Sequence, residues 1–240
     1  MYRRSYMSFF PPLTPVLKYL VIVTSAIFVL TYIPALLLDW NAPVYWLGLT
    51  PYLVTHQGRL WQPFTYLFIH GGPLHIIFNL LMLWMFGSDL ERKWGSRQFL
   101  FYFFLTGVGA ALFDVLLQPS ATTPTIGNSG AVFGVLLAFG LLFPDRPIFL
   151  WFVIPVKAKW VVLGMGIFEF ISELSRSHSG ISHIAHLGGM LFGFLYLRGG
   201  GFWYRWQLNF QEWRRARLRK KFEIYMRKHE QKDDAGRWIN

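Results

Sequence analysis

The chain lacks cysteine and is poor in charge. None of its 240 residues is cysteine, so disulfides, thiolate-bound zinc, iron–sulfur clusters and cysteine nucleophiles are excluded. Charged residues make up 15% of the sequence, against about 25% in an average soluble domain, while hydrophobic residues reach 54%. This composition argues against a soluble enzyme and against a disordered chain, and it predicts a protein embedded in a lipid bilayer.

The charge that is present is mostly positive and unevenly placed. The net charge is +11, and residues 201–240 carry eleven Lys and Arg against five Asp and Glu. A basic end of this kind is typical of a cytoplasmic segment near anionic lipid, so we expect it to contact the bilayer rather than nucleic acid. Within it, Trp203, Tyr204 and Trp206 predict an interfacial aromatic belt, and residues 213–228 predict a basic surface helix.

Six apolar segments predict membrane-spanning helices, each of which needs about 20 apolar residues. They are residues 15–38, 73–86 with an extension toward 90, 99–117, 126–143, 160–171 and 181–197. The fifth segment is the weakest of the six. The predicted fold is therefore an all-α polytopic membrane protein with six transmembrane helices.

Loop charges set the expected orientation. Lys and Arg gather before the first segment, between the second and third, between the fourth and fifth, and in the tail, which places both termini in the cytoplasm. We expect a cytoplasmic N-terminus at residues 1–14, a membrane domain at 15–200 and a cytoplasmic tail at 201–240. Residues 39–72 predict an outer interfacial loop, and residues 148–155 a short interfacial element. We therefore expect a multi-pass protein of the plasma (inner) membrane.

Polar residues inside these segments are costly and point to function. Ser129 stands in Gly127-Asn128-Ser129-Gly130 at the start of the fourth segment, where the glycines leave its hydroxyl uncovered. His186 lies about 9 Å into the sixth segment, at a comparable depth. Gly189 and Gly193 follow on its helix face and allow a close approach of the two helices. The alternatives are a serine bonded to its own helix and a packing histidine.

His75 and Asn79 are four residues apart, so they share a helix face at the start of the second segment. Two polar donors at one depth suit a developing oxyanion, and interhelical hydrogen bonding for stability is an equal alternative. Asp114 and Glu169 also lie in apolar segments. We expect them to have structural roles.

Together these strings resemble the rhomboid family of intramembrane serine proteases. The resemblance rests on residues 127–134 (GNSGAVFG), residues 185–189 (AHLGG) and the spacing of His70, His75 and Asn79. Trp61-Gln62 resembles the family's Trp-Arg position with Gln in place of Arg, which would weaken the anchoring of the outer loop. Glu91 and Gly95 resemble the turn after the second helix.

The resemblance implies a Ser–His dyad without an acid and without metal or cofactor, in which Ser129 is the nucleophile and His186 the general base. It implies that His75, Asn79 and the backbone at Gly127 and Asn128 stabilise the oxyanion and the substrate. The implied supporting residues are His70, Phe133, His183, Gly189 and Gly193. The implied substrates are transmembrane proteins with a helix-destabilised segment, cleaved by an enzyme that is active as a monomer.

Two rival functions use the same residues. A transporter or metal channel would employ His70, His75, His183 and His186 as ligands, but carboxylates at matching depth are missing and Ser129 has no role. A catalytically inactive relative would bind transmembrane helices as a chaperone, but such relatives typically lack the Ser or the His.

Overall fold

The computed structural model describes residues 11–150, 153–175, 182–199, 217–223 and 225–226, and this part of the chain is mostly helical. The chain divides into two compact units, residues 1–195 and 196–240. In the second unit, residues 217–223 and 225–226 are helical and fall within the predicted surface helix. The predicted aromatic belt of Trp203, Tyr204 and Trp206 lies outside the described residues, as do residues 1–10 of the predicted N-terminal segment.

Each of the six predicted segments is a helix. They are α1 (Pro15–Leu38), α5 (Pro73–Trp94), α6 (Ser96–Leu117), α7 (Ser129–Leu142), α8 (Ala158–Leu174) and α9 (His183–Arg198). Within the described residues, α1, α5 and α6 are long and apolar enough to cross a membrane, while α7 is apolar but only 14 residues long. The predicted helical membrane fold is confirmed in this form, and the count of six crossings stays a prediction.

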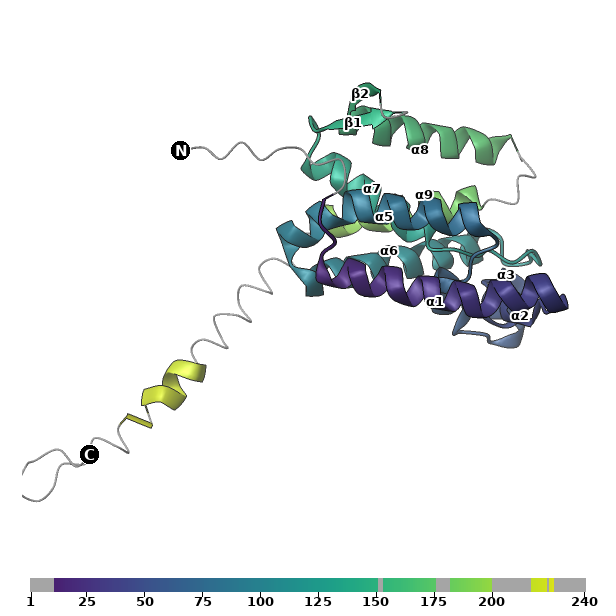
Figure 1. Cartoon of the computed structure of the whole chain (residues 1–240), viewed down its shortest axis with the longest axis horizontal. Coiled ribbons are helices and arrows are strands. Elements are labelled where there is room, and N and C mark those ends of the chain that lie inside the picture. Colours follow the sequence, from purple (N-terminus) through teal and green to yellow (C-terminus); the bar gives the residue numbers. More distant parts are fainter. Residues whose placement is uncertain (1–10, 151–152, 176–181, 200–216, 224, 227–240) are drawn as a thin grey trace, which may run out of the picture. The chain divides into compact units, whose positions relative to one another are not determined.

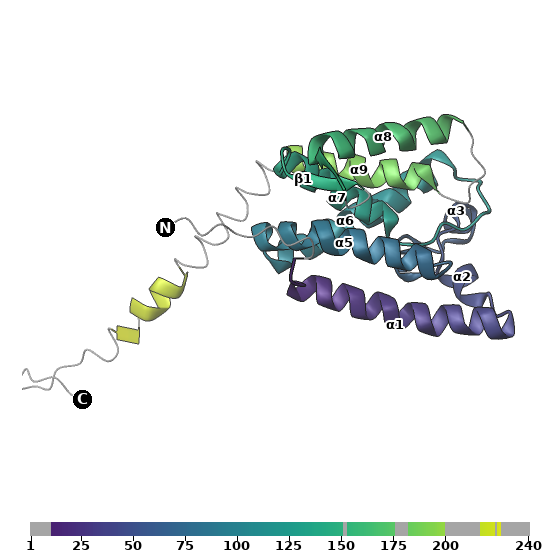
Figure 2. The same cartoon turned by 45° about the horizontal axis from the view of Figure 1, so that its top comes forward.

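The helices of the first unit stack side by side around α7. Most residues of α7 are buried, because α5 and α6 pack on it as well as α8. In both views α1 and α8 lie on opposite sides of the bundle, with α5, α6 and α7 between them (Figures 1 and 2). The central helix is therefore the one whose sequence carries Ser129 at its first position.

The predicted outer loop is folded into short helices rather than lying as an irregular connection. These are α2 (Ala42–Leu47), α3 (Pro51–Gln57), α4 (Gln62–Thr65) and the 3₁₀ helix η1 (Tyr66–Phe68). Gln62 is fully buried, and its Oε1 accepts a hydrogen bond from the Thr50 N–H at 3.0 Å. Arg59 is also buried, donates to the Tyr45 carbonyl at 3.2 Å and lies over the Tyr45 and Trp46 rings. Gln62 and Arg59 therefore both anchor this segment through buried contacts, and the weakening expected from the missing arginine stays a prediction.

Residues 148–155 are predicted as an interfacial element, and their position at the interface stays a prediction. Among the described residues of this range, 148–150 and 154–155 belong to an antiparallel pair of strands, β1 (Pro147–Leu150) and β2 (Ile154–Lys157). β-Branched residues and Pro155 favour an extended chain over a helix here. The hairpin connects α7 to α8.

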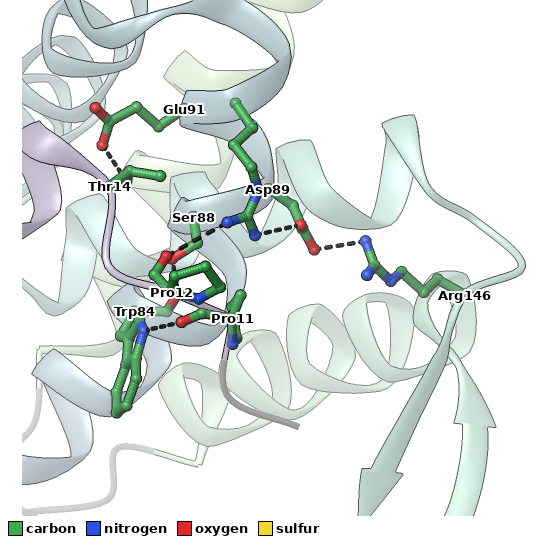
Figure 3. Close-up of polar contacts among 9 residues, drawn as sticks. Pro11, Pro12, Thr14, Trp84, Ser88, Asp89, Glu91 and Arg146 are labelled. Carbon is green, nitrogen blue, oxygen red and sulfur yellow. Dashed lines mark hydrogen bonds and ion pairs between the residues drawn. The ribbon is translucent and has the colours of Figure 1, made fainter. Parts of the chain in front are cut away.

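The chain before α1 is fixed to α5 by a buried carboxylate, Glu91 (Figure 3). Glu91 accepts hydrogen bonds from the Thr14 hydroxyl and from the N–H groups of Val16 at 3.0 Å and Leu17 at 3.2 Å. The Ser96 hydroxyl donates to it at 2.6 Å. Because the first N–H groups of a helix lack partners within the helix, Glu91 caps α1 and joins it to the turn between α5 and α6.

Ion pairs continue this network at the same end of α5. Asp89 contacts Arg92 at 2.8 Å and Arg146 at 2.5 Å, and Trp84 donates its indole N–H to the Pro11 carbonyl at 2.7 Å (Figure 3). Glu91 lies about 24 Å along α5 from His75, so the network holds the bundle together at the end remote from the polar cluster described next.

Candidate active site

Ser129 stands at the first position of α7, directly after a tight turn. Gly127 has φ +103°, a conformation that only glycine adopts readily, and a Cβ placed there would lie 2.6 Å from Nε2 of His75. Asn128 then forms the N-cap of the helix. The N–H groups of the first turn have no acceptor within a helix, so backbone donors lie next to the Ser129 hydroxyl.

Ser129 and His186 are in direct hydrogen-bonding contact. Oγ of Ser129 lies 2.7 Å from Nε2 of His186. The imidazole is buried and stacks on Phe133, with ring centroids 4.3 Å apart and planes inclined by 14°. Stacking on one face and the serine at one edge fix the orientation of the ring.

A glycine contact lets α7 and α9 approach this closely. A Cβ on Gly189 would overlap the carbonyl oxygen of Gly130. Gly193 has a different neighbour, because a Cβ there would meet the hydroxyl of Tyr102 on α6. The expected glycine stripe is therefore divided between two partner helices, and Gly189 is the member that admits the Ser129–His186 contact.

His75 and Asn79 converge on Gly127, beside Ser129. An added Cβ on Gly127 would lie 2.6 Å from the His75 ring and 3.7 Å from Nδ2 of Asn79. The Gly71 N–H donates to Nδ1 of His75 at 3.4 Å, which leaves the ring hydrogen on Nε2. Asn79 uses one Nδ2 hydrogen on the His75 carbonyl at 3.0 Å and keeps the second. Both side chains can therefore donate toward the space in front of Ser129.

One cavity of about 780 Å³ is lined by the four polar residues Ser129, His186, His75 and Asn79. The rest of its wall is mainly apolar and comes from α5, α7 and α8, including Phe78, Val132 and Met165, and from residues that directly precede α5, α7 and α9. Ser129 is partly accessible, whereas His186 is buried behind it. The cavity thus presents a hydroxyl to an apolar ligand while keeping the imidazole out of bulk solvent.

The other predicted residues of this region lie behind the cavity. Neither Gly127 nor Asn128 lines it, and the Asn128 side chain is 1% exposed. His70 is buried beside His75, whose ring centroid is 5.0 Å away. Burial, followed by the charge of His75, lowers the pKa of His70 to about 4, so His70 is a neutral packing group at physiological pH.

The sequence matches the Rhomboid domain over residues 57–200, more than half of the chain and every residue of this site. The chain belongs to the rhomboid family. Rhomboid protein 1, mitochondrial, of Saccharomyces cerevisiae is 30% identical over 165 residues, covering 65% of this chain and 47% of the yeast protein. Rhomboid protease GluP of Bacillus subtilis is 30% identical over 139 residues, 58% of this chain and 25% of the relative.

A third relative, Rhomboid-like protein 11, chloroplastic, of Arabidopsis thaliana, is 30% identical over 168 residues, 61% of this chain and 55% of the relative. The chain therefore spans between a quarter and just over half of the length of these relatives. The resemblance to the rhomboid family is confirmed. Together with the apolar helices it makes this chain an integral membrane protein.

Two carboxylates of this rhomboid chain, both expected to have structural roles, lie close to the site. Asp114 on α6 is 3% exposed and accepts hydrogen bonds from Thr125 at 2.9 Å and from Ser182 at 3.2 Å. Thr125 lies four residues before Ser129, and Ser182 four residues before His186. One carboxylate therefore ties together the segments that lead into both helices.

The second carboxylate, Glu169 on α8, lies against both histidines of α9. Its Oε2 is 2.6 Å from Nδ1 of His183 and 3.0 Å from Nδ1 of His186, and all three residues are buried. We call these three residues the Glu–His cluster. In the sequence, the only sign of the Glu–His cluster is the acidic residue Glu169 within an apolar segment.

The Glu–His cluster is also the only group of three or more potential ligands among the described residues, with ligand atoms within 4.8 Å of one another. Zinc accepts this donor set, but tetrahedral ligation at about 2.0–2.1 Å places ligand atoms roughly 3.3 Å apart. Both contacts of Glu169 are shorter than this spacing: the one of 2.6 Å is a hydrogen bond with His183, and the one of 3.0 Å is an ionic contact with His186. The chemistry of the cluster is therefore that of a carboxylate holding imidazoles.

Proposed function

We propose that this chain is an intramembrane serine protease that hydrolyses peptide bonds in or near transmembrane segments. The observation that carries the proposal is the 2.7 Å contact between Ser129 and His186 inside a mainly apolar cavity. A serine hydroxyl becomes a useful nucleophile only beside a base, and this contact supplies one.

The proposed reaction starts when Ser129 attacks the carbonyl carbon of the scissile peptide. Nε2 of His186 takes the Ser129 proton as the Oγ–C bond forms, and it then gives that proton to the leaving amine. The negative charge on the carbonyl oxygen is stabilised by the Ser129 N–H together with His75 and Asn79. Water then hydrolyses the acyl-enzyme, with His186 as base again, and regenerates Ser129.

The cavity wall supports a transmembrane segment as substrate. Leu74 and Phe78 on α5 line the cavity and are 69% and 62% exposed, so an apolar chain can pack on them. A helix hides its carbonyl groups in backbone hydrogen bonds. We therefore expect cleavage where the substrate helix is destabilised.

The proposal includes the topology and the site's support. The domain of residues 15–200 crosses the membrane six times, with the N-terminal segment 1–14 and the basic tail 201–240 in the cytoplasm. The site then opens to the outer face of the plasma (inner) membrane, where water is available. Phe133 and His183 hold His186 in place, His70 supports the outer segment, and one copy of the chain is sufficient for activity.

The two rival functions are less well supported. His70 and His75 lie beside each other, whereas His183 and His186 belong to the Glu–His cluster, so the four histidines do not form one ligand set among the described residues. An inactive relative that only binds transmembrane helices does not need a hydrogen-bonded Ser–His pair, so the pair favours the protease.

The test is cleavage of a single-span reporter by the purified chain in liposomes. Ser129→Ala should abolish cleavage and labelling by a fluorophosphonate probe, since both need the hydroxyl. Ser88→Ala is the matched control, because Ser88 is buried near the other end of α5 and donates only to the Trp84 carbonyl. Cleavage by Ser129→Ala at the wild-type rate would refute the proposal.

A further inference from the structure

The position of Glu169 is energetically demanding. It stands in an apolar helix, between the exposed Phe168 and Phe170, yet its own side chain is turned inward and only 5% of the residue is exposed. A buried carboxylate at membrane depth is costly unless it is paired, and it commonly marks function. Its partners are the two histidines of the Glu–His cluster.

The role of His186 as a base depends on which of its two ring nitrogens carries the hydrogen, and therefore on the group next to Nδ1. Nε2 can accept the Ser129 proton only if the resting hydrogen is on Nδ1. Nδ1 is buried and has no hydrogen bond of good geometry to any described residue. Glu169 is its ionic neighbour: Oε2 lies 3.0 Å from Nδ1, out of line with the N–H, so the carboxylate acts on the ring mainly through its charge.

We propose that Glu169 is the positioning acid of a Ser129–His186–Glu169 relay. It selects the Nδ1–H tautomer of His186 and stabilises the imidazolium that forms when Ser129 loses its proton. His183 holds the carboxylate in place through its shorter contact of 2.6 Å. This inference rests on the proposed function, and it replaces a two-residue dyad with a relay that has an acid on α8.

A purely structural role makes a different prediction. If Glu169 only joins α8 to α9 through His183, then loss of either partner should have the same effect. If Glu169 acts on His186, its charge should matter for the chemical step even when the His183 contact is already weakened. The two roles can therefore be separated by comparing single and double variants.

The experiment compares Glu169→Gln, Glu169→Asp, His183→Asn and the double variant Glu169→Gln/His183→Asn in liposomes. We expect Glu169→Gln to lower kcat by about 10²-fold with little change in KM, at the lower end for a positioned acid–base group because the N–H is out of line. Labelling of Ser129 by a fluorophosphonate should slow by a similar factor. Glu169→Asp keeps the charge and should recover part of the loss.

His183→Asn should cost less than Glu169→Gln, and the double variant should be no slower than Glu169→Gln alone. The matched control is Glu173→Gln, one turn further along α8, which should behave like wild type. Equal losses in kcat and labelling from Glu169→Gln and His183→Asn, with no recovery by Glu169→Asp, would overturn the relay, as would wild-type rates in Glu169→Gln.

A measurement on the wild-type chain covers the case in which the Glu169 and His183 variants do not fold. In its ¹⁵N-histidine NMR spectrum, the signal assigned to His186 by its loss in His186→Asn should show hydrogen on Nδ1 and none on Nε2. Hydrogen on Nε2 in the resting state would overturn the proposal. If the wild type cleaves no reporter, the proposed function fails, whereas the labelling rates and the tautomer still decide the role of Glu169.

Discussion

The close approach of α7 and α9 at Gly189 makes a sharp prediction for Gly189→Ala. The new methyl group would overlap the Gly130 carbonyl oxygen and lie 2.7 Å from its carbonyl carbon. Carbon atoms reach favourable van der Waals contact at about 3.5–4.0 Å, so the helices must separate locally by about 1 Å. The Ser129–His186 contact, now 2.7 Å, would then lengthen beyond the range of a good hydrogen bond.

A misplacement of this size is expected to lower turnover by about 10²-fold, and overpacking should cost about 1–3 kcal/mol of stability. Reporter cleavage in liposomes measures the first effect, and thermal unfolding in detergent measures the second. Gly164→Ala on α8 is the matched control, since among the described residues no heavy atom beyond its own helix backbone and chain neighbours lies within 4 Å of its added Cβ, and alanine there should leave cleavage unchanged. Wild-type turnover in Gly189→Ala would refute the claim that backbone contact positions the Ser–His pair.

Other parts of the chain lead to further predictions. His75→Ala and Asn79→Ala should each slow cleavage by about 10²–10³-fold, the typical cost of one oxyanion donor, and unchanged turnover in both would make the pair structural only. Glu91→Gln should lower the free energy of unfolding in detergent by about 1.5–3 kcal/mol, the range for hydrogen bonds to a charged group, and an unchanged melting temperature would contradict its role as the cap of α1. In the cysteine-free chain, Ser120→Cys should react with an impermeant thiol reagent from outside the membrane and Arg97→Cys from the cytoplasmic side only, and the reverse pattern would invert the topology. A chelator should leave cleavage intact, because the Glu–His cluster is spaced for hydrogen bonding, and loss of activity restored by zinc would show a metal site instead.

The sequence predicted the positions of α1, α5, α6, α7, α8 and α9 because apolar runs are separated by proline, glycine and charged turns. Pro15 and Pro73 begin helices, a position that proline favours, and Gly95 separates α5 from α6. The short helices of residues 39–72 were not predictable in the same way. They depend on buried tertiary contacts of Arg59 and Gln62, which local propensity does not reveal.

The candidate site was only partly predictable for a similar reason. Helical spacing pairs His75 with Asn79 within one helix, but it does not say which neighbouring helix receives a side chain. Gly193 shows this limit, since it lies against α6 while Gly189 lies against α7. A structural role is expected for Glu169 from its place near the end of an apolar segment. Its distances to His183 and His186 depend on how α8 and α9 pack, which the sequence alone does not show.

The two hydrogen bonds of Asp114 have a consequence for how the molecule loses its activity. Both go to one carboxylate oxygen, so the segment before Ser129 and the segment before His186 share one of their anchors. Local opening of either segment removes one hydrogen-bond partner of Asp114. The hydrogen bond between Asp114 and the other segment is then weakened as well. The nucleophile and its base should therefore be disordered together, and a partly opened chain should not carry a reactive serine without the histidine that controls it.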